Sequence, residues 1–159
     1  MKSGQEVVLS VTIDPLLLNV PREQAFWFLA NMENESLWHP KVDKLEKVGN
    51  EQIGLGTEFV SANNEEGAVK LRLDDFVPCE RLGNTIERND GTITRWSGAL
   101  SSMPDHKTLL IQTWQILGSK PLNKESVSKN RRDFLDYSEF LNPYLKSGVE
   151  KYSKQPTKI

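Results

Sequence analysis

The chain has 159 residues, of which 37% are hydrophobic and 26% are charged. This length and composition exclude a disordered or fibrous protein and fit one globular domain, residues 1–159, around a single core. The formal net charge of −2 argues against a protein built mainly to bind nucleic acid. Cys79 is the only cysteine, which excludes an intrachain disulfide and is typical of a reducing compartment.

The N-terminal part predicts one strand followed by two short helices. Apolar residues recur at every second position from Val7 to Ile13, which is the spacing of a strand with one apolar face. Pro21-Arg22-Glu23-Gln24 predicts a helix start, because proline is tolerated in the first turn, and apolar residues then recur at helical spacing through Met32. A second short helix is expected over Glu35–Trp38, ending before Pro40.

The region from Val42 to Leu117 predicts short strands separated by turns. Clusters such as Asn63–Gly67 and Asn89–Gly91 separate runs of strand-forming residues, and the second cluster is a hairpin signal. Such short runs in succession predict an antiparallel meander. The six expected strands are Val42–Val48, Thr57–Ala62, Val69–Leu73, Arg81–Arg88, Thr92–Leu100 and Thr108–Leu117.

After a break at Gly118–Pro121, the sequence predicts one long helix with a single buried face. The residues of this face are three or four positions apart: Phe134, Ser138, Leu141, Leu145, Val149 and Tyr152. The spacing keeps its phase across Pro143, so we expect a kinked but continuous helix. A restart with Asn142 as N-cap is the alternative. Residues from Lys154 onward are expected to fray.

Three segments, taken in order, carry a resemblance to a known family. They are Trp38-His39-Pro40, Gly54-Leu55-Gly56-Thr57, and the Leu71–Leu82 segment with Pro78 in its turn. Their succession resembles the START-like (SRPBCC) superfamily, which includes polyketide cyclase/dehydrase-like and lipid-transfer proteins, and the resemblance covers nearly the whole chain.

The resemblance implies an α+β helix-grip fold. A curved antiparallel sheet of about seven strands would wrap around the long C-terminal helix, with two short helices after the first strand and a cavity between sheet and helix. Members of the family commonly carry two consecutive prolines, or Pro-Pro-Arg, in the turn where this chain has Pro78-Cys79-Glu80-Arg81. The subfamily therefore stays open.

Several kinds of site are poorly supported by the sequence. Gly54-Leu55-Gly56 is followed by strand-forming residues, whereas a nucleotide-binding loop leads into a helix. The two histidines, His39 and His106, each lack a second histidine or cysteine three or four residues away, which is the usual spacing of zinc ligands on one helix. There is no Gly-x-Ser-x-Gly elbow, and Cys79 is interpreted as inert. We therefore expect no metal and no cofactor.

Aromatic residues from most of the predicted elements are the candidates for ligand contact. Aromatic side chains bury large areas and commonly line apolar cavities. The competing interpretation is that they fill a closed core. The candidate ligand-binding residues are Phe26, Trp38, Phe59, Trp96, Trp114, Phe134, Tyr137 and Leu141.

Four polar residues are candidates for orienting or protonating a ligand: His39, Arg95, Gln112 and Tyr137. Neighbouring residues of a strand point to opposite faces, so if Trp96 faces the cavity, Arg95 faces away from it. The sequence leaves the inward face open from Thr92 onward, and no catalytic residue is assigned.

The leading hypothesis is binding of a hydrophobic small molecule or lipid between the sheet and the C-terminal helix. A cyclase/dehydrase-like or hydrolase-like enzyme is the alternative that the resemblance allows. A third hypothesis is a protein-partner module, because the segment from Gly118 onward has nine Lys and Arg against five Asp and Glu.

The chain shows no signal for membrane insertion. Residues Met1–Glu6 lack the apolar core of a signal peptide, and the longest strongly apolar run, Ala25–Ala30, is far shorter than a membrane span. We expect a cytoplasmic protein without integral membrane association. The oligomeric state is not predicted.

Overall fold

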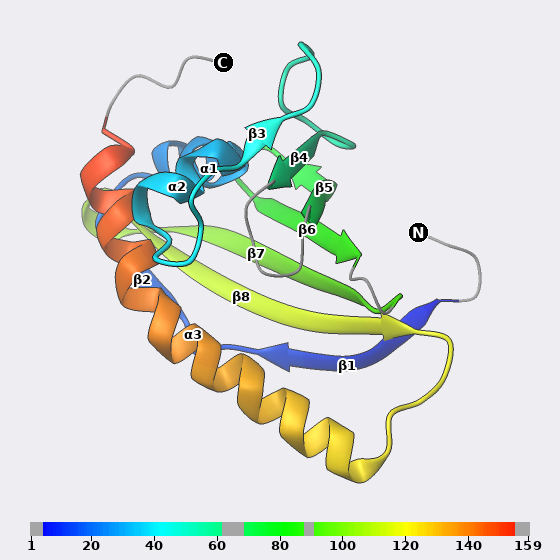
Figure 1. Ribbon diagram of the computed structural model, residues 1–159. Coiled ribbons are helices and arrows are strands. Elements are labelled where there is room, and N and C mark those ends of the chain that lie inside the picture. The colour runs from blue at the N-terminus through cyan, green and yellow to red at the C-terminus, as the bar shows by residue number, and fades with distance from the viewer. Residues whose placement is uncertain (1–4, 62–68, 88–90, 155–159) are drawn as a thin grey trace.

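A computed structural model of the chain describes residues 5–61, 69–87 and 91–154 (Figure 1). The N-terminal elements are β1 (Glu6–Thr12), β2 (Leu16–Leu18), α1 (Arg22–Ala30), the 3-10 helix η1 (Met32–Asn34) and α2 (Glu35–Trp38). The sheet continues with β3 (Glu46–Lys47), β4 (Glu58–Ser61), β5 (Val69–Val77), β6 (Arg81–Glu87) and β7 (Ile93–Met103). The 3-10 helix η2 (Pro104–His106), β8 (Lys107–Gly118) and α3 (Lys124–Tyr152) complete the fold.

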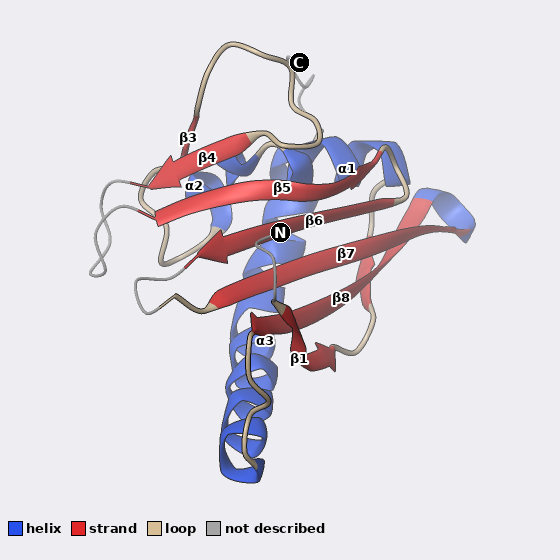
Figure 2. Ribbon diagram, turned by 90° about the vertical axis from the view of Figure 1, so that its right-hand side faces the viewer, coloured by secondary structure: helices blue, strands red, loops and turns tan. Residues whose placement is uncertain are grey.

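The strands form one antiparallel sheet in the order β1-β8-β7-β6-β5-β4-β3, with β2 also paired to β8. Figures 1 and 2 show that the sheet is curved and that α1, α2 and α3 all lie against the same face of it. The α+β helix-grip prediction is confirmed, including the two short helices after the first strand and the long C-terminal helix.

The sheet has one strand more than expected. Asp14-Pro15 ends β1, but the chain stays beside β8, and Leu16–Leu18 pairs with Leu110–Thr108 as β2. The expected strand over Val42–Val48 is reduced to Glu46–Lys47, because the chain turns after Pro40 and the N–H of Val42 donates to the carbonyl of His39. The turn expected at Asn63–Gly67 lies outside the described residues. So do positions 62 and 88–90 and residues 155–159, which were expected to fray.

Helix α3 runs without interruption from Lys124 to Tyr152, with Pro143 inside it. The N-cap is Asn123, whose Oδ1 accepts a 2.8 Å hydrogen bond from the N–H of Ser126. The alternative of a restart at Asn142 is wrong, because the Asn142 side chain accepts a hydrogen bond from Gln112 instead of capping a helix. None of the helices in the described residues has both the length and the apolar character required to cross a membrane.

Two apolar clusters hold the sheet and the helices together. The larger one joins α1, the sheet and the C-terminal half of α3, and its fully buried members include Phe26, Phe59 and Val149. The smaller one lies where β1 and β8 meet the first half of α3, with Phe134 packed against it. Burial of these faces supplies the main stabilisation of the fold.

Candidate functional site

A cavity of about 940 Å³ lies between the sheet and the helices α2 and α3. Of its 21 lining residues, 13 have apolar or tryptophan side chains and eight are more polar. The eight are Asn31, Glu35, His39, Lys41, Ser61, Asn84, Gln112 and Tyr137. Apolar walls with a few polar groups are typical of sites for small organic molecules.

Five of the eight residues predicted to contact a ligand line this cavity. They are Trp38, Trp96, Trp114, Tyr137 and Leu141, which come from α2, the central strands and α3. Ligand contact by these five residues stays a prediction.

The other three predicted residues lie outside the cavity lining. Phe26 is fully buried and makes edge-on contacts with Trp27 and Phe76, with ring centroids 5.2 and 5.3 Å away. Phe59 is fully buried in the larger apolar cluster. Phe134 stacks on Trp114, with centroids 5.5 Å apart. Helical spacing predicted Phe26 and Phe134 on inward helix faces, but spacing cannot distinguish core from cavity wall.

Two tryptophans on adjacent strands form a fixed aromatic wall. Trp96 and Trp114 face each other across the β7–β8 ladder. Trp96 Nε1 donates to Gln112 Oε1 at 3.0 Å, and Gln112 Nε2 donates to Asn142 Oδ1 at 2.9 Å. Trp114 Nε1 donates to Ser138 Oγ at 3.0 Å. Because both indole N–H groups are satisfied within the protein, the rings offer mainly apolar surface to a ligand.

The orientation of Trp96 settles the inward face of β7. Gly98 makes room for the ring, because a Cβ at this position would lie 2.9 Å from Cη2 of Trp96. Arg95 lies on the opposite face, where its Nε donates to Asp74 Oδ2 at 2.8 Å. Of the four polar candidates, Arg95 is therefore the one that does not line the cavity.

His39 and Tyr137 join α2 to α3 at the cavity wall. His39 Nε2 and Tyr137 Oη are 2.8 Å apart, and the N–H of Lys41 donates to His39 Nδ1 at 3.1 Å. Burial, with a smaller repulsion from Lys41, lowers the pKa of His39 to about 4. The ring is therefore neutral near neutral pH, and because Nδ1 is an acceptor, Nε2 carries the proton and donates to Tyr137.

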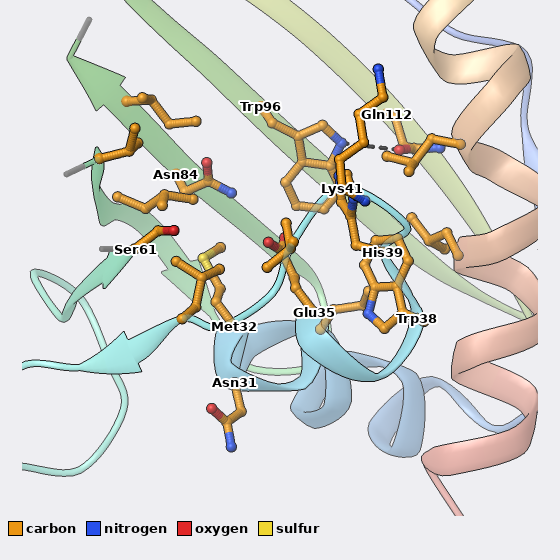
Figure 3. A pocket seen from close by; sticks show the side chains of 18 of the residues that line it. Asn31, Met32, Glu35, Trp38, His39, Lys41, Ser61, Asn84, Trp96 and Gln112 are labelled. Carbon is orange, nitrogen blue, oxygen red and sulfur yellow. Dashed lines mark hydrogen bonds between the residues drawn. The ribbon is translucent and has the colours of Figure 1, made fainter. Parts of the chain in front are cut away.

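Glu35 is a cavity residue that the sequence interpretation missed. Its carboxyl group reaches into the cavity from α2 (Figure 3). Burial disfavours the charged form and raises the pKa of Glu35 to about 7. Its spacing was the available signal, because Glu35 precedes Trp38 and His39 by three and four residues and so shares their helix face.

Removing the Glu35 charge should change how stability depends on pH. The folded pKa of Glu35 lies above its unfolded value of 4.5, so its contribution to stability is present at acid pH and is lost as pH rises through about 7. Glu35→Gln should therefore stabilise the protein more at alkaline pH than at acid pH, by on the order of 2 kcal/mol. Urea unfolding of the wild type and the Glu35→Gln variant at acid and alkaline pH measures the difference in their free energies of unfolding. An equal gain in stability at every pH would contradict the prediction.

Asn84 is the second missed residue. It lies on β6 and is only 6% exposed, and it lines the cavity. Strand alternation was the signal, because Leu82, Asn84 and Ile86 share one face and only the middle residue is polar. Within residues 5–61, 69–87 and 91–154, no three His, Cys, Asp or Glu side chains gather into a group that could hold a metal ion.

Comparisons with known proteins identify similar folds at low sequence identity. No protein-family model and no curated protein sequence matches the chain. A START superfamily protein from Mycobacterium smegmatis is similar in structure, with a TM-score of 0.67 and 11% identity over 89% of this chain and 97% of that one.

Two further solved structures resemble the chain. The Zhui aromatase/cyclase from Streptomyces sp. R1128 has a TM-score of 0.63 and 12% identity over 94% of each chain. Ara h 8.0201 has a TM-score of 0.62 and 16% identity over 88% of this chain and 96% of that one. At these identities the similarity shows a shared fold.

Proposed function

Because the chain has the START-like helix-grip fold, we propose that it binds a hydrophobic small molecule or lipid in the cavity between the sheet and α3. The observation that carries this proposal is the cavity of about 940 Å³ with mainly apolar walls. The cavity is partly open, so its apolar walls are in contact with water. A ligand that fills it would remove that apolar surface from water.

The chemistry of the lining indicates the kind of ligand. Apolar and aromatic walls supply affinity by removing apolar surface from water. Trp96 and Trp114 are held by hydrogen bonds to Gln112 and Ser138, so the flat aromatic wall exists before a ligand arrives. Such preorganisation lowers the entropy cost of binding. The proposed ligand is therefore mainly apolar, and the polar lining residues set its orientation.

Filling the cavity with a larger side chain tests the proposal. Ile86 of β6 lines the cavity, so Ile86→Trp should occupy ligand space. Thr85, the preceding residue of β6, points to the opposite face of the sheet and pairs with Arg72 and Arg95 on the neighbouring strands. Thr85→Trp is therefore the matched control. Each purified protein is denatured, and its organic extract is measured by mass spectrometry.

We expect a compound to co-purify with the wild type and the Thr85→Trp variant and to be reduced at least about tenfold in the Ile86→Trp variant. The identity of that compound gives the ligand class. Equal amounts in both variants would show that the compound binds elsewhere. If all extracts are empty, the same three proteins are titrated with aromatic probes, and binding that the Ile86→Trp substitution leaves unchanged would contradict a cavity ligand.

A further inference from the structure

The carboxyl of Glu35 and the amide of Asn84, both on the cavity wall, make no hydrogen bond or ion pair with any residue that the structure describes. Asn84 is more than nine-tenths buried. The polar atoms of both residues are open to the cavity and are not among the fully enclosed unpaired atoms of the described residues. A ligand that displaces water from them must therefore offer them hydrogen bonds or leave them unpaired at a cost. Both groups therefore remain available to a ligand.

The two groups enter the same space from different walls. Figure 3 shows Asn84 reaching in from the sheet and Glu35 reaching in from α2. The backbone of Asn84 is fixed on both sides, by Leu73 of β5 and Trp96 of β7. Helix α2 is anchored to α3 through His39 and Tyr137. Both side chains thus extend from well-supported backbone toward the cavity.

The surroundings of Glu35 favour its uncharged form. The other titratable groups of the lining are His39 and Lys41, which follow α2, and Tyr137 on α3, and the sheet strands contribute no charged residue. His39 is neutral and bonded to Tyr137, and Lys41 is exposed. No cation pairs with the Glu35 carboxyl among the described residues. An apolar ligand would displace water and disfavour the carboxylate further.

We propose that Glu35, as a carboxylic acid, and the amide of Asn84 recognise an uncharged ligand by donating hydrogen bonds to a carbonyl group. Binding is then coupled to proton uptake by Glu35. This inference rests on the proposed function and specifies the ligand class. A carbonyl oxygen accepts two hydrogen bonds, which matches one donor from each wall.

A ligand ammonium group is the competing chemistry. It would pair with ionised Glu35, and the two ligand classes predict opposite effects of pH. The carbonyl ligand needs the protonated carboxyl and binds more weakly as pH rises. The ammonium ligand needs the carboxylate and binds more tightly as pH rises.

Three probes with the same apolar body distinguish these possibilities: methyl naphthyl ketone, ethylnaphthalene and naphthylmethylamine. Their affinities are measured by isothermal titration calorimetry on ligand-stripped protein. Near pH 5.5 the ketone should bind about tenfold more tightly than ethylnaphthalene, and this advantage should fall several-fold by about pH 8.5. Proton uptake appears as a dependence of the binding heat on the buffer.

Two variants and a control assign the effect to the two residues. Glu35→Gln keeps a donor that does not titrate, so ketone affinity should lose its pH dependence and proton uptake. Asn84→Leu should weaken the ketone about tenfold and leave ethylnaphthalene within about twofold. Glu139→Gln changes an exposed carboxylate on α3 and should change neither the affinity for the ketone nor its pH dependence. Circular dichroism confirms that each variant is folded.

Equal affinities for ketone and ethylnaphthalene would overturn the carbonyl proposal while leaving the apolar cavity as a binding site. Tighter binding of the amine, increasing with pH, would overturn it in favour of a cationic ligand. If ethylnaphthalene and the ketone both fail to bind, the proposed function fails as well.

Discussion

Replacing Gly148 with alanine should destabilise the protein by about 3 kcal/mol, near the upper end of the range for an overpacked site. The same change inside a helix ordinarily stabilises a protein, because glycine costs up to about 1 kcal/mol relative to alanine. The sign is reversed here because Gly148 is the point at which α2 rests on α3.

The geometry leaves no room for a side chain at this position. A Cβ on Gly148 would lie 2.2 Å from Cβ and 2.7 Å from Cγ of Trp38. Trp38 cannot rotate its own Cβ away, so α2 as a whole must move. Because Trp38, His39 and Glu35 all line the cavity from this short segment, we expect the variant to lose ligand affinity together with stability.

Urea unfolding followed by circular dichroism measures the change in the free energy of unfolding. Ser147→Ala is the matched control, because Ser147 is the exposed neighbour of Gly148 on α3 and should be neutral or gain a few tenths of a kcal/mol. A Gly148→Ala variant as stable as Ser147→Ala would show that α2 does not pack on α3 in this way.

Replacing Phe26 with alanine should lower the free energy of unfolding by about 3–5 kcal/mol, the cost of deleting a buried phenylalanine and leaving a cavity. Phe26 is fully buried on α1 and contacts the rings of Trp27 and Phe76. Marginal stability means that such a loss is a large fraction of the total. The effect should be on stability and not on the ligand site, because Phe26 is outside the cavity lining.

Phe140→Ala is the control for this prediction. Phe140 is the same residue type on α3 but is 43% exposed, so its removal should change stability by no more than about 0.5 kcal/mol. Chemical denaturation gives both values, and a probe titration below the unfolding transition tests binding. A Phe26→Ala variant that remains stable but no longer binds the probe would show that Phe26 belongs to the ligand site.

Much of the fold could be predicted from the sequence because its signals are local. Alternation from Val7 to Ile13 and the spacing of Leu141, Leu145 and Val149 reflect the geometry of single strands and helices. The short helix Glu35–Trp38 was predicted with the bounds it has. The extra strand β2 was missed because Leu16–Leu18 is short, and it is a strand only through its pairing with β8.

The tertiary structure alone decided which side chains surround the cavity. Buried residues have the same apolar character whether they pack against other side chains or face a void, so Phe26 and Trp96 look alike in sequence. Packing separates them: Phe26 meets Phe76, whereas Trp96 leans over Gly98 toward the cavity.

The roles of Glu35 and Asn84 also depend on contacts between distant segments. A carboxylate on a short helix and an asparagine on a strand are ordinarily solvated. Spacing places each of them on a face shared with apolar or aromatic residues, but it does not show that the face is enclosed. Curvature of the sheet and docking of α2 against α3 at Gly148 enclose both groups among apolar walls. The sequence by itself determined the fold and most of its elements, because their patterns are short-range, whereas β2 and the two-residue β3 depend on strand pairing and on a turn. Burial and partnering, which set the chemistry of the site, arise only when residues about 50 positions apart, such as Glu35 and Asn84, are brought to one cavity.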